Sequence, residues 1–288
     1  MKLSRTRVAF VLAMLVVTSS GCGIVNRIRA KNQLNEAASA YRDAHFEEAE
    51  QRARRALELD PTNKTAALFL ARIVHRQYKR GVTTPENIAR ARDAIELYKK
   101  ILEGDPKNEE AFKAIADLYG SIREDDKQRA WILQHASDRN IADDKRAEAY
   151  IILASKDWHC SNEITDLPSN KTTSVNPATN KATVSYRKPE TSKDEKDFQS
   201  AKMCMTRGLE EIENAVKLDP TSEPAWSYKT NLLLEASKLA EMEGKMPEKA
   251  LLDKQEAAAQ KRTNELSEAN QKRKKEEEAK KAASPPGG

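Results

Sequence analysis

A helical pattern that stops at Asp-Pro occurs three times in the chain and limits its fold more than any other feature. It covers residues 56–61, 101–106 and 215–220. Proline disfavours helical geometry in the residue before it, so each Asp-Pro is expected to end a helix. Apolar residues spaced three and four apart follow each proline, which predicts that a new helix begins there. The sequence therefore predicts helices in series, joined by short turns.

The composition agrees with helices and disfavours folds rich in β-structure. The 288 residues include only 9 Gly and 11 Pro, aromatic residues make up 5%, and charged residues make up 33%. An all-β sandwich or barrel needs a turn signal every ten residues or so. Loops that hold phosphate groups depend on glycine. The composition therefore argues against all-β folds and most nucleotide-binding folds.

The repeated pattern resembles the tetratricopeptide repeat, a pair of antiparallel helices about 34 residues long. Small and aromatic residues occupy the family's positions around the Asp-Pro turns: Ala37, Phe46, Ala49 and Ala56 in the first repeat, Ala94 and Tyr98 in the second, and Phe112, Ala116 and Tyr119 in the third. The resemblance implies an all-α fold over residues 30–255. It would be a right-handed superhelix of about five antiparallel helix pairs.

Two segments lack the apolar pattern of this array. Residues 163–196 are rich in Ser, Thr, Asn, Lys and Pro, so we expect a long disordered insertion that forms a flexible loop within the fourth hairpin. Residues 256–288 favour helix but have no apolar face, which indicates a charged tail that frays into solvent. The lysine-rich part of this tail, 271–281, could instead grip an anionic polymer or lipid.

Residues 1–21 have the features of a bacterial signal peptide. A basic start precedes ten apolar residues at 8–17. This run is too short to span a membrane, because a spanning helix needs about 20 apolar residues. The small residues before Cys22 resemble a lipobox, which implies cleavage before Cys22, its lipidation, and a short lipid-anchored tether at 22–29. Ser19 stands where the lipobox usually has Leu, so ordinary cleavage and an exported soluble protein stay open.

The net charge argues against a nucleic-acid partner. Removing the leader takes three of the 50 basic side chains away and leaves 47 against 45 acidic ones. A nucleic-acid-binding domain carries a concentrated basic surface instead.

Two cysteines remain after Cys22. Cys160 and Cys204 flank the 163–196 segment, on stretches that lie side by side in an antiparallel hairpin, so we predict a disulfide between them in an oxidising compartment. Two buried thiols are the first alternative. A metal site formed with His159 is the second, but no further ligand pair supports it.

No motif for catalysis or for cofactor binding is found, so we expect neither an enzyme nor a cofactor, metal or small-molecule substrate. The resemblance places the first helix of each pair on the inner wall of the superhelix. Its outward positions form the predicted partner-binding groove: Tyr41, Arg72, His75, Arg76, Asp117, Trp158 and Asn231. Arg72 and Arg76, one turn apart, could hold a carboxylate of a peptide. Solvated helix faces, with Tyr41 and Trp158 packing between hairpins, are the alternative.

The expected function is a non-enzymatic scaffold for protein–protein interaction. It would bind a protein or peptide partner in the cell envelope and support the assembly or stability of an envelope complex. A lipid anchor would hold it at a membrane, on the periplasmic face. The residue after Cys22 resembles the sorting signal for the outer membrane. The alternative is an accessory subunit of a cell-wall or polysaccharide enzyme that binds glycan or peptidoglycan. An unrecognised hydrolase on a helical scaffold is a third possibility.

Overall fold

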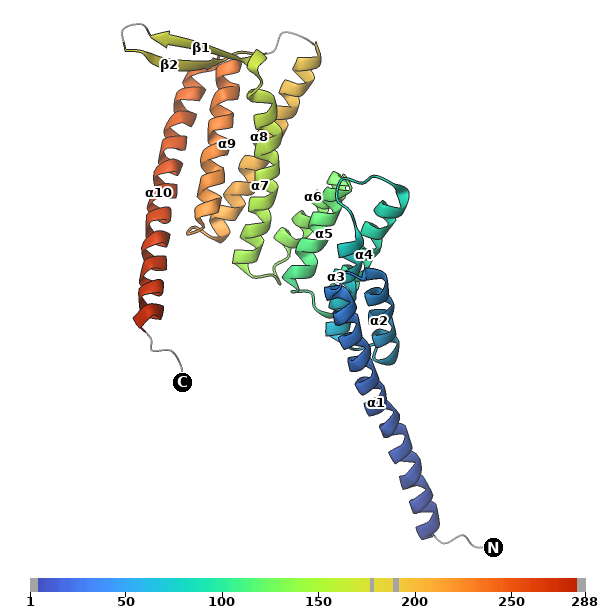
Figure 1. Ribbon diagram of the computed structural model, residues 1–288. Coiled ribbons are helices and arrows are strands. Elements are labelled where there is room, and N and C mark those ends of the chain that lie inside the picture. The colour runs from blue at the N-terminus through green and yellow to red at the C-terminus, as the bar shows by residue number, and fades with distance from the viewer. Residues whose placement is uncertain (1–4, 177–178, 189–191, 284–288) are drawn as a thin grey trace. The chain divides into compact units, whose positions relative to one another are not determined.

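The computed structural model describes residues 5–176, 179–188 and 192–283 (Figure 1). Within them the backbone is almost entirely helical, with one two-stranded sheet. The chain divides into two compact units, Met1–Gln128 and Arg129–Gly288. Each unit has buried hydrophobic clusters of its own.

The first unit is built from helical hairpins. Helix α1 packs against α2, and α3 packs against α4. Contacts of α2 with α3 and of α4 with α5 join successive hairpins, and α6 continues into the second unit. The helices span Arg5–Arg42 (α1), Phe46–Leu59 (α2), Lys64–Gln77 (α3), Pro85–Gly104 (α4), Glu109–Ser121 (α5) and Asp125–Ser137 (α6).

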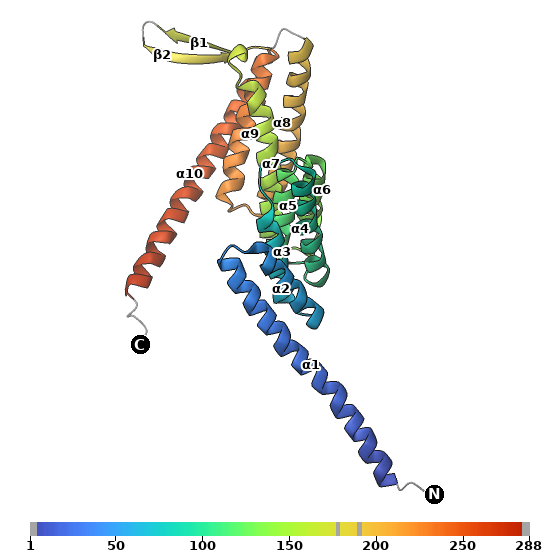
Figure 2. The same ribbon diagram turned by 45° about the vertical axis from the view of Figure 1, so that its right-hand side comes forward.

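The second unit packs α7 against α8 and α9 against α10, and α9 contacts both helices of the first pair. Figure 2 shows the two strands at one end of these helices. The elements span Asp143–Thr165 (α7), Lys171–Asn176 (β1), Lys181–Tyr186 (β2), Ser192–Leu218 (α8), Glu223–Met242 (α9) and Met246–Ala283 (α10), with a 3-10 turn at Pro168–Asn170. The all-α fold of consecutive helical hairpins predicted from the sequence is confirmed.

The three Asp-Pro turns share one set of hydrogen bonds. The backbone N–H of Asp60, Asp105 or Asp219 donates to the carbonyl four residues earlier, at 2.9 Å in each case. Three positions after the aspartate, a polar residue caps the next helix by accepting from a backbone N–H; these caps are Asn63, Asn108 and Ser222. Such a cap satisfies a donor that the first turn of a helix leaves free. The repeated sequence therefore encodes a repeated turn.

The prediction of a disordered insertion over residues 163–196 is wrong for much of this segment. Helix α7 extends to Thr165, and residues 171–176 pair with 181–186 in an antiparallel hairpin. Tyr186 packs against the cluster around Phe198, and its backbone N–H donates to Glu241 at 3.0 Å. The Thr and Val residues favour strand, but most side chains of the hairpin are exposed, so the segment has no apolar face that would reveal it in the sequence.

The expected end of the packed array at residue 255 is also wrong. Helix α10 continues without a break, and Ala259 and Leu266 are buried. Asn270 donates to Glu223 at the start of α9, at 3.1 Å. Residues 271–280 are all exposed, as the sequence predicts for a charged tail. The apolar contacts are too widely spaced along α10 to stand out among its charged residues.

The predicted leader lies in the first part of α1. The side chain of Cys22 and all those before it lie outside the described side chains, so lipidation stays a prediction. No helix in the described ranges has the length and apolar character required to cross a bilayer.

Candidate functional site

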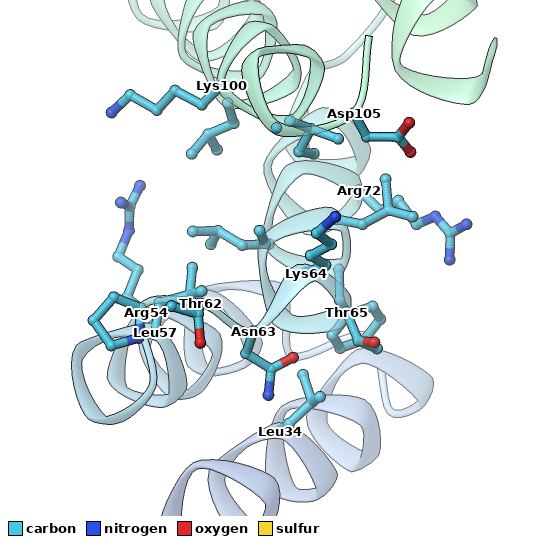
Figure 3. Close-up of a pocket in the computed structure, with 18 of the residues that line it drawn as sticks. Leu34, Arg54, Leu57, Thr62, Asn63, Lys64, Thr65, Arg72, Lys100 and Asp105 are labelled. Atoms are coloured by element: carbon cyan, nitrogen blue, oxygen red, sulfur yellow. The ribbon is translucent and has the colours of Figure 1, made fainter. Parts of the chain in front are cut away.

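The first unit contains a pocket of about 970 Å³ beside the first Asp-Pro turn (Figure 3). Side chains of α1, α2 and α3 line it, together with the C-terminal end of α4. Its position follows from the sequence, because Pro61 ends α2 and Asn63 starts α3 at the pocket wall. The volume is within the range of ligand-binding pockets in proteins.

The wall of the pocket is largely aliphatic. Leu34, Leu57, Leu68, Leu97 and Ile101 all line it, and each is half-buried. Alanines fill the core beneath, where Ala30, Ala56 and Ala66 pack together with no exposed surface. Small core residues bring the helices close together and leave the larger side chains at the surface. The pocket therefore offers an apolar surface that a partner could cover.

Two arginines at the pocket are already paired. Arg54 donates to Glu50 at 2.7 and 2.9 Å. Arg72 makes two hydrogen bonds to the carboxylate of Glu110, and this pair lowers the pKa of Glu110 and raises that of Arg72. The role predicted for Arg72, holding a partner's carboxylate, is thus filled by a glutamate of the same chain.

Two lysines at the pocket have no carboxylate partner within the described residues. Lys64 lies at the start of α3, and Lys100 lies near the end of α4; both are exposed. Figure 3 shows Lys100 on the same side of the pocket as Arg54. These ammonium groups are free to pair with acidic groups of a bound molecule. The groove predicted from the first helices of the repeats missed both, because Lys100 lies on a second helix and Lys64 lies beside a turn.

The remaining predicted groove residues of the first unit are held by neighbouring side chains. The guanidinium of Arg76 lies 5.9 Å from the ring centre of Phe46. Tyr41 makes edge contacts with Phe46 and with Phe69. These contacts agree with the alternative that Tyr41 packs between hairpins.

His75 and Asp117 are similarly engaged. The ring of His75 lies against Tyr98, and burial lowers the pKa of His75. Burial also raises the pKa of Tyr98 to about 12. Asp117 pairs with Arg80 at 2.7 Å. Of the predicted groove residues, Arg72 alone lines the pocket.

Trp158 and Asn231 belong to the second unit. Trp158 packs against Tyr228 and against the cluster that includes Ala154 and Leu232. This contact agrees with the packing alternative for Trp158. Asn231 is half-buried on α9.

The predicted disulfide between Cys160 and Cys204 is present. It joins α7 to α8, with Cα atoms 6.0 Å apart, and the two cysteines are 44 positions apart in the sequence. Both sulfur atoms are used in this bond, so the metal site considered with His159 is not formed. Within the described residues, no group of three or more His, Cys, Asp or Glu side chains is arranged to hold a metal ion.

A buried ionic cluster next to the disulfide was not predicted. Asp157 accepts hydrogen bonds from Arg129 at 3.0 Å and from Arg207 at 2.7 Å, and Arg129 also donates to Glu211. Gly208 lets α8 lie close to both α7 and α9, because a Cβ atom there would lie 3.2 Å from Asp157 and 2.7 Å from Leu232. Burial raises the pKa of Glu211 to about 8, since the attraction of Arg129 only partly offsets the loss of solvent.

The raised pKa of Glu211 predicts a dependence of stability on pH. A carboxyl whose pKa is higher in the folded state stabilises the fold while protonated, and this contribution is lost as the pH rises from about 4.5 toward about 8. We expect urea unfolding of wild type to show this fall between pH 5 and pH 8. Glu211→Gln, which mimics the protonated group, should show a smaller fall. Equal pH dependence of the two proteins would contradict the prediction.

A second buried polar cluster surrounds Glu235 on α9. Its carboxylate accepts hydrogen bonds from Asn162 at 2.9 Å, from Thr165 at 2.6 Å and from Ser161 at 3.4 Å, and Lys238 donates at 2.6 Å. A serine beside a glutamate and a lysine suggests hydrolase chemistry. Ser161 and Glu235 have no exposed surface, however, so this cluster holds α7 to α9 and is closed to a substrate.

Comparisons with known proteins give a likeness in fold. No protein-family model matches the sequence, and no curated protein matches it. Among solved structures, MamA from Desulfovibrio magneticus RS-1 aligns with 84% of this chain and 96% of its own, at 12% identity and a TM-score of 0.40.

Two further structures are similar in the same way. A tetratricopeptide repeat protein from Parabacteroides merdae aligns with 83% of this chain and 97% of its own, at 12% identity and a TM-score of 0.35. YrrB, described as a TPR protein with an unusual peptide-binding site, aligns with 77% of this chain and 90% of its own, at 12% identity and a TM-score of 0.36. The likeness concerns the fold alone.

Proposed function

We propose that this chain is a non-enzymatic scaffold that binds a segment of another protein in the pocket of its first unit. The observation that carries the proposal is an aliphatic pocket with two free lysines at its edge. An amphipathic peptide matches such a surface, because its apolar side chains cover the leucines while its acidic groups pair with Lys64 and Lys100.

The proposed location is the periplasmic face of a bacterial envelope membrane, with Cys22 lipidated. The basic start, the apolar run at 8–17 and the small residues before Cys22 support this location. The disulfide supports it as well, because such bonds persist in oxidising compartments. In that location the scaffold would serve the assembly or stability of an envelope complex.

Charge reversal at the pocket tests the binding site. We expect Lys64→Glu together with Lys100→Glu to weaken capture of the partner from solubilised envelope by about tenfold or more, because acidic groups then face acidic groups. The matched control reverses two exposed lysines of the second unit, Lys217→Glu and Lys254→Glu. Equal capture by both double variants would overturn the pocket as the binding site. Retention on peptidoglycan without a protein partner would favour the glycan-associated alternative.

A further inference from the structure

The middle of α1 carries an apolar stripe that no part of the described chain covers. Ile24, Val25 and Ile28 are 62%, 46% and 58% exposed, although each is a large aliphatic side chain. At about 3.6 residues per turn, the three lie on one side of the helix, and Ala30 faces the opposite side. Ala30 is completely buried in the core of the first unit. The stripe therefore points away from the core of the first unit.

Basic residues border this stripe. Arg27 and Arg29 lie on its two sides, and Lys31 follows one turn after Arg27. All three are exposed and have no ion-pair partner within the described residues. Residues 23–35 contain no acidic side chain at all. An exposed aliphatic stripe bordered by cations is the pattern of a helix that lies in the interface of an anionic membrane.

We propose that residues 23–31 form a second membrane contact, in which the aliphatic stripe enters the interface and the basic side chains meet anionic headgroups. The inference rests on the proposed placement of the chain at a membrane. It does not require the lipid on Cys22, because the binding comes from the stripe and its charges. A membrane fits better than a protein here because the stripe directly follows the predicted lipidation site.

Vesicle binding by protein without a lipid tests this proposal. A chain that begins at Gly23 keeps every described core side chain, since the first of them is Ala30. We expect it to co-sediment with vesicles of phosphatidylcholine and phosphatidylglycerol, and only weakly with phosphatidylcholine alone. Ile24→Gln with Ile28→Gln should lower the partition coefficient by about tenfold or more. Replacing Arg27, Arg29 and Lys31 by Gln should lower it by about a hundredfold on anionic vesicles at low salt.

The matched control removes exposed leucines elsewhere. Leu234→Gln with Leu251→Gln changes two aliphatic side chains that are 45% and 57% exposed, and binding should be unchanged. No binding by the wild-type chain, or equal binding by the stripe variant, would overturn the inference. Mass spectrometry of Cys22 from envelope protein tests the lipid anchor separately, so failure of the anchor and failure of the stripe give different results.

Discussion

Glu235→Ala is expected to lower the free energy of unfolding of the second unit by about 3–5 kcal/mol. The variant removes the nearer carboxylate of the buried Lys238 ammonium, which keeps only Asp166 at 3.7 Å, and it removes the acceptor of Ser161, Asn162 and Thr165. Urea unfolding followed by tryptophan fluorescence measures this loss directly. All three tryptophans, Trp131, Trp158 and Trp226, lie in the second unit, so the signal reports on that unit.

Two further variants separate the buried charge from the shape of the side chain. Glu210→Ala removes an exposed glutamate from α8 and should change the free energy by less than about 0.5 kcal/mol. Replacing both Glu235 and Lys238 by Leu removes both charges and should recover part of the loss, because no unpaired ion remains. A loss below about 1 kcal/mol in Glu235→Ala would show that the cluster does not hold α7 to α9.

Reduction of the Cys160–Cys204 disulfide is expected to destabilise the second unit by about 2–4 kcal/mol. The bond closes a loop that contains the whole β1–β2 hairpin, so reduction lets the unfolded chain explore many more conformations. The fluorescence transition should move to lower urea concentration when dithiothreitol is added.

The control for this measurement is a variant without the bond, Cys160→Ala with Cys204→Ala. It should unfold near the midpoint of the reduced wild type, and dithiothreitol should not move that midpoint. An unchanged wild-type transition under reducing conditions, with both thiols shown to be free, would contradict a stabilising role for the bond.

The helical hairpins could be predicted because their signals are local. An Asp-Pro pair, a capping residue and apolar spacing lie within a few residues of one another, so one stretch of sequence reveals each turn. The disulfide was predictable for a similar reason, since Cys160 and Cys204 flank one interruption of the pattern.

The β-hairpin could not be predicted because its support comes from distant residues. Its base is held by Glu241 and by Lys238, whose ammonium lies 5.3 Å from the ring centre of Tyr186. Neither contact is visible in the composition of residues 163–196. A polar segment with few large apolar side chains reads as a loop when considered without its neighbours.

The groove prediction treated charged residues one at a time and therefore missed their pairing within the chain. Arg72 has no acidic partner on its own helix. The next hairpin supplies one, Glu110, which is 38 positions away in the sequence. The pocket itself draws on α1, α2, α3 and α4, and its lysines come from positions that the family's inner wall does not include. Pairing between hairpins decides which charges remain available to a partner.

Photo-cross-linking from within the pocket directly tests whether the pocket binds a protein partner. Leu68 lines the pocket, and Leu251 is exposed on α10 of the second unit. A photoreactive phenylalanine analogue is placed at one of these two positions in the full chain, in intact cells, and cross-linked products are identified by mass spectrometry. We expect one defined protein partner attached at position 68, lost when Lys64 and Lys100 are changed to Glu, and not attached at position 251. The same products from both positions, or none from position 68, would contradict it.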